Sequence, residues 1–115
     1  SCPVGPYLDK ERSIRNWPIQ AYGAEMMRIA CILATEAGVS VCTPVHDALL
    51  IEADHDDVAD AVTLTKNAMR RASKLVLSGF ELRADHKVLC HGARFRDKRG
   101  VETWELVRRF AGLPP

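Results

Sequence analysis

Residues 39–53 of this 115-residue chain, VSVCTPVHDALLIEA, give the clearest indication of its fold. Two runs rich in Val, Leu and Ile, 39–45 and 48–53, flank one polar pair, His46 and Asp47. Each run has the length and the β-branched content of a strand. Parallel strands need a crossover of about a dozen residues, and no such length separates these two runs. They therefore predict an antiparallel hairpin with His46 and Asp47 at its turn.

A long helix is predicted before the hairpin. Asn16 is a suitable N-cap residue, and Pro18 stands where a proline is tolerated in the first helical turn. Apolar residues then recur at helical spacing until Gly38, which is a typical C-terminal stop. Because this helix is apolar on nearly all sides, we expect it to be well buried.

A second helix is predicted after the hairpin, over residues 54–77. Its apolar stripe consists of Val58, Ala61, Val62, Thr65, Ala68, Met69, Ala72, Leu75 and Val76. Acidic residues crowd its start and basic residues its later half, which complements the helix dipole. We interpret the acids Asp54, Asp56 and Asp57 as capping residues rather than as a metal site.

The rest of the chain completes an α+β prediction. Apolar and charged residues alternate over 80–85, which predicts a third strand. Residues 102–110 read as a short closing helix, with Trp104 and Val107 on one side. We therefore expect a single domain over residues 1–115, in which an antiparallel sheet packs with two long helices and a short C-terminal helix.

Composition limits the classes of function. The formal net charge is +1, so no global field draws the chain onto nucleic acid or a membrane. Basic residues nevertheless gather early and late, the late group being Arg94, Arg96, Lys98 and Arg99. Any polyanion binding should therefore be local and confined to a groove. No apolar run approaches the ~18 residues of a membrane span, and we expect a cytoplasmic protein.

The four cysteines, Cys2, Cys31, Cys42 and Cys90, have neither the spacing of a zinc module nor that of a disulfide scaffold. Cys90 and His91 lack a partner at metal-site spacing. We interpret the cysteines as small buried apolar residues in a reducing compartment.

The His46–Asp47 pair admits two interpretations from its residues alone. At the tip of a rigid hairpin, Asp47 would be well mounted as a metal ligand. Alternatively, the pair forms a polar turn in which the Asp47 carboxylate accepts a backbone N–H. A single His-Asp dipeptide does not decide between them.

Two motifs in this order resemble the C-terminal palm region of family A DNA polymerases, the DNA polymerase I family. Members have an Arg, then Asn-x-Pro-x-Gln leading into a long helix, then a hairpin with Val-His-Asp-Glu. The matching residues are Arg12, Asn16, Pro18 and Gln20, followed by Val45, His46 and Asp47. The resemblance extends from about residue 11 to residue 53 and is loose beyond Gly79.

The resemblance implies roles for five residues. Asp47 would hold catalytic divalent ions, Mg²⁺ or Mn²⁺, two of which serve nucleotidyl transfer in a complete polymerase. His46 would lie near the primer terminus. Arg12, Asn16 and Gln20 would face the minor groove of the primer–template. Arg, Asn and Gln side chains can donate to acceptors shared by all Watson–Crick pairs, so they can test pairing geometry. Asn16 remains a candidate helix cap, and its side chain could perform only one of these tasks.

The chain also departs from the family pattern. Ala48 replaces the usual Glu, and Glu52 cannot substitute because five strand residues place it about 16 Å from Asp47. Neither the motif A carboxylate nor the nucleotide-gripping fingers helix is recognisable. With no initiating Met, we expect a piece of a larger polymerase that is inactive alone. Its partners would be primer–template DNA, dNTP and the rest of the polymerase chain, and an exposed apolar face predicts self-association.

Two other functions stay open. One is a non-catalytic DNA-binding or polymerase-accessory module. Ala48 and the missing motif A favour this function. The other is an HD-type metal phosphohydrolase, in which a His-Asp pair and further histidines, such as His55, His86 and His91, bind metal. That family places its ligands on helices, whereas His46 and Asp47 lie in strand-like sequence.

Overall fold

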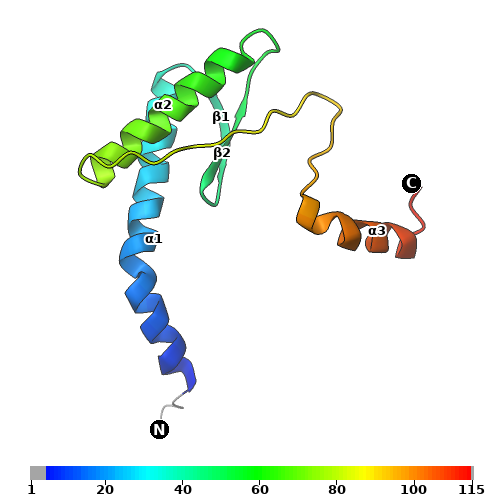
Figure 1. Ribbon diagram of the computed structural model, residues 1–115, viewed down its shortest axis with the longest axis horizontal. Helices are drawn as coiled ribbons and strands as arrows, with labels where there is room; N and C mark the ends of the chain where they lie inside the picture. The colour runs from blue at the N-terminus through cyan, green and yellow to red at the C-terminus, as the bar shows by residue number, and fades with distance from the viewer. Residues whose placement is uncertain (1–4, 115) are drawn as a thin grey trace. The chain divides into compact units, whose positions relative to one another are not determined.

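The computed structural model describes the backbone of residues 5–114 and the side chains of residues 14–114. It is a mixed α+β structure, as predicted, with three α-helices and a two-stranded antiparallel sheet (Figure 1). The elements in chain order are α1 (Gly5–Glu36), β1 (Ser40–Val45), β2 (Ala48–Glu52), α2 (Val58–Val76), the 3-10 helix η1 (Lys98–Gly100) and α3 (Val101–Phe110). They form two compact units, residues 1–85 and residues 86–115.

The first helix is longer than the sequence predicts. α1 begins by Gly5 rather than at Asn16, so Pro18 lies inside the helix and not in its first turn. Proline has no N–H to donate to the carbonyl four residues earlier, which here belongs to Ile14. The side chains of Ile14 and Trp17 are exposed, so water can reach this part of the helix and bind that carbonyl.

The predicted helix stop at Gly38 is confirmed. The Val39 N–H donates to the Ala34 carbonyl and the Gly38 N–H to the Thr35 carbonyl, both at 3.0 Å. This is the Schellman pattern, and Gly38 takes the required positive φ of 89°. Ala34 and Val39 are both buried in the core that accompanies the motif, so the stop also sets the direction in which β1 begins.

The predicted hairpin is confirmed as well. β1 and β2 pair antiparallel from Val45 opposite Ala48 to Ser40 opposite Glu52, with a bulge at Cys42. His46 and Asp47 form the two-residue turn, in which His46 has a φ of +54°. A positive φ at the first turn residue is typical of hairpin turns that match the strand twist.

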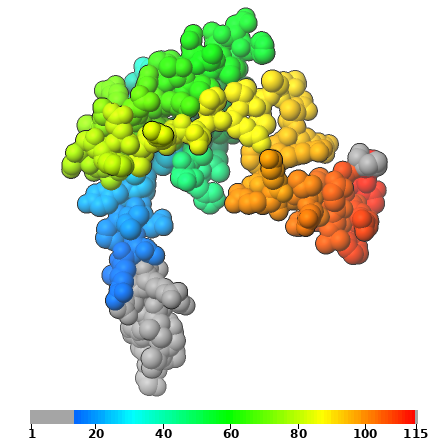
Figure 2. Space-filling model, viewed as in Figure 1, coloured from blue at the N-terminus to red at the C-terminus, as the bar shows by residue number. Residues whose placement is uncertain are grey.

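The core of the first unit is small and rich in alanine. α1 packs against α2 and the hairpin, and the buried apolar residues of the described chain are Ala30, Ala34, Val39, Ala68 and Ala72. The expectation that α1 is well buried is wrong for its earlier part, where Ile19 and Tyr22 are 71% and 54% exposed. On the face shown in Figure 2, neither α2 nor the hairpin covers that part of the helix. The buried residues of α1 in the described chain, Ala30 and Ala34, lie near the end of the helix.

α2 follows the predicted periodicity with two differences. Leu75 is exposed, and Ser73 is buried on the packed side instead. Asp57 occupies the N-cap position, but its side chain makes no capping hydrogen bond. The interpretation of the acids as capping residues is therefore wrong for Asp57, and Asp60 in the first turn matches only the dipole argument.

The predicted third strand is not formed, because residues 80–85 take irregular structure in the described chain. Their polar groups bind α2 instead of a strand edge. The Leu82 N–H donates to Ser73 Oγ at 3.1 Å, and Glu81 forms ion pairs with Lys74 and Arg70. This segment therefore runs along α2 and leaves the sheet with two strands.

The second unit contains the predicted closing helix, α3, preceded by an irregular segment and η1. Asp97 caps η1 by accepting a hydrogen bond of 2.9 Å from the Arg99 N–H. Arg108 pairs with Glu105 one turn earlier on α3. These local contacts order residues 97–110 as a basic, helical segment.

Candidate functional site

Asp47 lines a pocket in the first unit. The pocket has a volume of about 250 Å³ and is bounded by α1, α2, the hairpin turn and the segment after α2. Gly23, Met27 and Ala30 form its α1 wall, while Met69 and Ser73 belong to α2. The hairpin turn thus adds one acidic residue to the lining of a mainly apolar cavity.

Asp47 is accessible to solvent and is not neutralised by an ion pair within the described residues. Arg83 also lines the pocket, so a cation and an anion share its wall. No group of three His, Cys, Asp or Glu side chains within residues 14–114 could hold a metal ion together. Asp47 can therefore supply one hard oxygen ligand, and the other ligands of an ion would have to come from elsewhere.

The structure places Asn16 and Gln20 on the face of α1 that leads to this pocket. Residues three or four apart share a helix face, and Asn16 and Gln20 continue at that spacing through Gly23 and Met27. Both amide side chains are exposed. At 1.5 Å per residue, Gln20 lies about 10 Å along the helix from Met27. The polar stripe therefore ends where the pocket begins.

The observed start of α1 determines where Asn16 and Arg12 lie in the helix. Because α1 begins by Gly5, Asn16 is not a helix N-cap, and its side chain is available for other contacts. Arg12 lies four residues before Asn16 on α1, which puts it on the same stripe. The Arg12 side chain lies outside the described residues.

His46 stands beside Asp47 but does not share its pocket wall. It is exposed, and the pocket's described lining includes Asp47 without His46. The positive φ of His46 turns the chain sharply at this point. The geometry thus separates the two members of the pair that the sequence places together.

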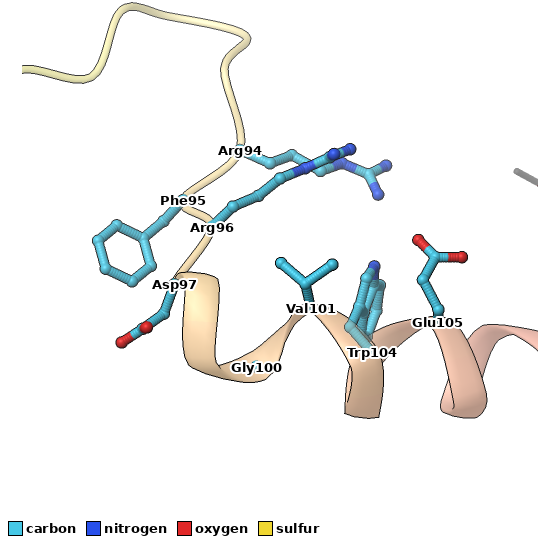
Figure 3. A pocket seen from close by; sticks show the side chains of 8 residues that line it. All are labelled: Arg94, Phe95, Arg96, Asp97, Gly100, Val101, Trp104 and Glu105. Carbon is cyan, nitrogen blue, oxygen red and sulfur yellow. The ribbon is translucent and has the colours of Figure 1, made fainter.

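A second pocket, which the sequence analysis did not predict, lies in the unit formed by residues 86–115. Its volume is about 300 Å³, and Figure 3 shows Arg94 and Arg96 extending over Val101 and Trp104. The basic cluster was visible in the sequence, and so was Trp104. Their convergence was not, because it depends on the irregular turn through η1.

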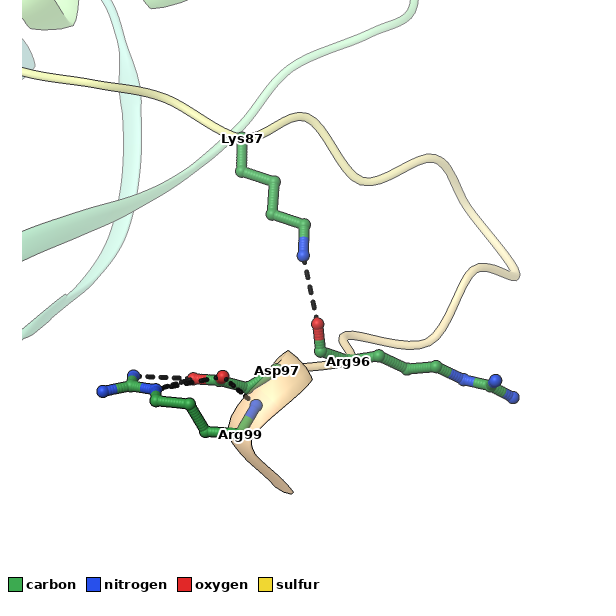
Figure 4. A network of polar contacts seen from close by, with 4 residues as sticks. All are labelled: Lys87, Arg96, Asp97 and Arg99. Carbon is green, nitrogen blue, oxygen red and sulfur yellow. Dashed lines mark hydrogen bonds and ion pairs between the residues drawn. The ribbon is translucent and has the colours of Figure 1, made fainter. Parts of the chain in front are cut away.

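Polar contacts among Lys87, Arg96, Asp97 and Arg99 hold the segment that leads into this second pocket (Figure 4). Lys87 Nζ donates to the Arg96 carbonyl at 3.2 Å and lies 4.8 Å from the centre of the Phe95 ring. Arg99 Nη2 donates to Asp97 Oδ2 at 2.7 Å. This side-chain contact, together with the Arg99 N–H, lowers the pKa of Asp97 to about 2.

The interpretation of the cysteines as buried is wrong for Cys42 and Cys90, which are exposed. Cys31 is partly buried, and all three are free thiols. Cys2 lies outside the described residues. Cys42 lies at the bulge of β1, a strand in which every residue except Val41 is exposed.

Comparison with protein-family models, with curated proteins and with solved structures gave no match for this chain. Within its described part, no helix is long and apolar enough to cross a membrane.

Proposed function

We propose that this chain is the C-terminal palm portion of a family A DNA polymerase and that Asp47 is one of its catalytic metal ligands. One observation supports the proposal most strongly. Asp47 lines a pocket whose α1 wall continues into the exposed stripe of Asn16 and Gln20. A metal ligand next to a row of amides matches the needs of an enzyme that joins nucleotides on a paired template.

The chemistry of each residue follows from its place. Nucleotidyl transfer uses two divalent ions ~4 Å apart to stabilise the attacking and leaving oxygens. Asp47 would contribute one carboxylate ligand to these ions. The remaining polymerase chain and the dNTP phosphates would supply the other ligands. Asn16 and Gln20, with Arg12, would donate to minor-groove acceptors of the terminal base pairs. His46, on the turn, would stand next to the primer end.

The departures from the family pattern limit what this chain could do on its own. Ala48 supplies no carboxylate, and Glu52 lies at the far end of the hairpin, opposite Ser40. The chain on its own therefore offers a single carboxylate at this site. We expect it to bind primer–template and not to extend the primer until the rest of the site is supplied.

Primer–template binding tests the minor-groove part of the proposal. Fluorescence anisotropy with a labelled primer–template should show that Asn16→Ala and Gln20→Ala each weaken binding about fivefold, the equivalent of one hydrogen bond of ~1 kcal/mol. Asn67→Ala is the matched control, because Asn67 is also an exposed helical amide but lies on α2. Equal effects at Asn16 and Asn67 would contradict the assigned face.

A non-catalytic DNA-binding module is the second candidate, and Ala48 favours it. Primer extension separates the two when the rest of a family A polymerase is supplied in trans with Mg²⁺ or Mn²⁺. For a polymerase portion, extension appears with this chain and disappears with Asp47→Asn. For a non-catalytic module, DNA binding persists, and extension is absent with both proteins.

A further inference from the structure

The two units of the chain differ in charge. Residues 86–115 contain seven Lys and Arg against three Asp and Glu, a net charge of +4, whereas residues 1–85 contain nine against twelve, a net charge of −3. The positive charge that the sequence places late in the chain therefore belongs to one compact unit. Such a concentration favours a polyanionic partner for that unit.

The pocket of this unit keeps two cations available. Of its acidic lining residues, Asp97 pairs with Arg99 and Glu105 pairs with Arg108. Arg94 and Arg96 are exposed, and neither forms an ion pair with any residue in the described part of the chain. Figure 3 shows both side chains extending in the same direction over the pocket.

The same pocket presents one aromatic face. Trp104 is 44% exposed and lies below the two arginines in Figure 3. Phe95 also lines the pocket, but Lys87 Nζ lies 4.8 Å from the centre of its ring, and in Figure 3 that ring points away from the two arginines. Trp104 is therefore the available ring for stacking, and Arg94 and Arg96 are the available cations.

We propose that the pocket between Arg94, Arg96 and Trp104 binds single-stranded DNA, with one base stacked on Trp104 and adjacent phosphates held by the two arginines. Cationic grooves with stacking aromatics are the usual means of gripping single strands. A duplex keeps its bases stacked inside, so it could offer phosphates to the arginines but no base face to Trp104. This site lies within residues 86–115 and does not depend on Asp47.

Binding of a labelled oligothymidylate to the full chain tests the arginines. The double variant Arg94→Gln/Arg96→Gln should reduce the slope of log affinity against log salt by about 1.4, since each phosphate contact on a single strand contributes about 0.7. Lys98→Gln/Arg109→Gln is the matched control, because it removes the same charge from exposed residues of this unit that do not line the pocket. Equal slope changes in both variants would overturn the site in favour of unspecific attraction.

Tryptophan fluorescence tests the stacking. In a Trp17→Phe background Trp104 is the single tryptophan, and the oligothymidylate should quench its emission more than a blunt duplex or a mononucleotide does. Trp104→Leu should weaken single-strand binding at least about fivefold. Absence of quenching, or equal affinity for the blunt duplex, would overturn the proposal even if Trp104→Leu fails to fold.

Variants of the first unit distinguish a failure of the single-strand site from a failure of the proposed polymerase function. Asp47→Asn and Asn16→Ala should leave oligothymidylate binding unchanged, because both residues belong to the first unit. Loss of single-strand binding in those variants would overturn the independent site and would assign the binding to the hairpin unit.

Discussion

Asp97 and Arg99 form the most strongly perturbed ionic contact among the described residues. Hydrogen bonds from the Arg99 side chain and backbone N–H hold the pKa of Asp97 at about 2, below its ordinary value of 3.8. Because folding favours the ionised form, the resulting stability is present above pH ~4 and is lost as the pH falls towards 2. The contact by which Asp97 caps η1 should therefore stabilise the folded state less and less as the pH falls from about 4 to 2.

Arg99→Gln should raise the pKa of Asp97 towards 3.8, since the variant removes the guanidinium that favours the carboxylate. A carbon-13 NMR titration of the Asp97 carboxyl measures this shift. Arg109→Gln, on α3, is the control and should leave the Asp97 titration unchanged. A pKa that stays near 2 in Arg99→Gln would show that another group holds the carboxylate.

Residue types and spacing predict the Asp47 site only in part. The turn position of His46 and Asp47 follows from the short strands on either side, which leave only two residues for the reversal. The pocket itself unites Gly23, Asp47, Met69 and Arg83, which are distant in sequence. No local pattern encodes such a contact, because it arises when α2 and its following segment pack onto α1.

At the scale of elements, the end of α1 depends on Gly38. A Cβ at this position would meet no atom within 4 Å, so the cost of Gly38→Ala is that of the positive φ alone. We expect a loss of about 1 kcal/mol in the free energy of unfolding. Gly23→Ala, inside α1 and equally free of contacts, should instead stabilise by about 0.5–1 kcal/mol. Urea denaturation measures both changes, and the same sign for both would contradict this account.

Ser73 fastens the segment after α2. Its hydroxyl donates to the Arg70 carbonyl at 2.8 Å and accepts from the Leu82 N–H at 3.1 Å, and the residue is buried. Ser73→Ala should therefore cost about 1 kcal/mol and should speed hydrogen exchange of the Leu82 amide. Ser78→Ala, an exposed residue just beyond α2, is the control. Unchanged exchange at Leu82 would show that the segment is held by its ion pairs alone.

Periodicity predicts the element types more reliably than their limits. The hairpin, α2 and α3 follow from their apolar patterns, and Gly38 marks the end of α1. The start of α1 was missed because Pro18 reads as a first-turn residue, although a helix can continue through proline where its free carbonyl meets water. The predicted third strand does not form because Glu81 and the Leu82 N–H bind α2, a tertiary preference that alternation cannot reveal.

At the scale of the whole molecule, much apolar surface is left uncovered within each unit. Ile14, Trp17 and Ile19 on α1 are between 65% and 71% exposed, and Phe110 on α3 is 84% exposed. The buried core of the first unit consists mostly of alanines, which bury little apolar area per residue. Both features suit a portion of a larger protein whose other parts cover these side chains.

We predict self-association from the same exposed side chains. Sedimentation velocity should show an average mass that rises with protein concentration, as apolar faces pair. Substitution of Trp17 and Ile19 by Gln should shift the chain towards monomer, whereas Leu64→Gln, at a less exposed position on α2, is the comparison. A strict monomer at all concentrations would count against an uncovered face that needs a partner.

The proposed function requires that Asp47 bind a divalent ion at the primer–template. Mn²⁺ broadens NMR signals of nearby amides, so it reports the position of the ion directly. With primer–template and dNTP present, Mn²⁺ should broaden the His46 and Asp47 amides, and Asp47→Asn should abolish this effect. Asp60→Asn, on α2, is the control and should leave it intact. Broadening at the turn that persists in Asp47→Asn, or no DNA-dependent broadening there, would contradict the account.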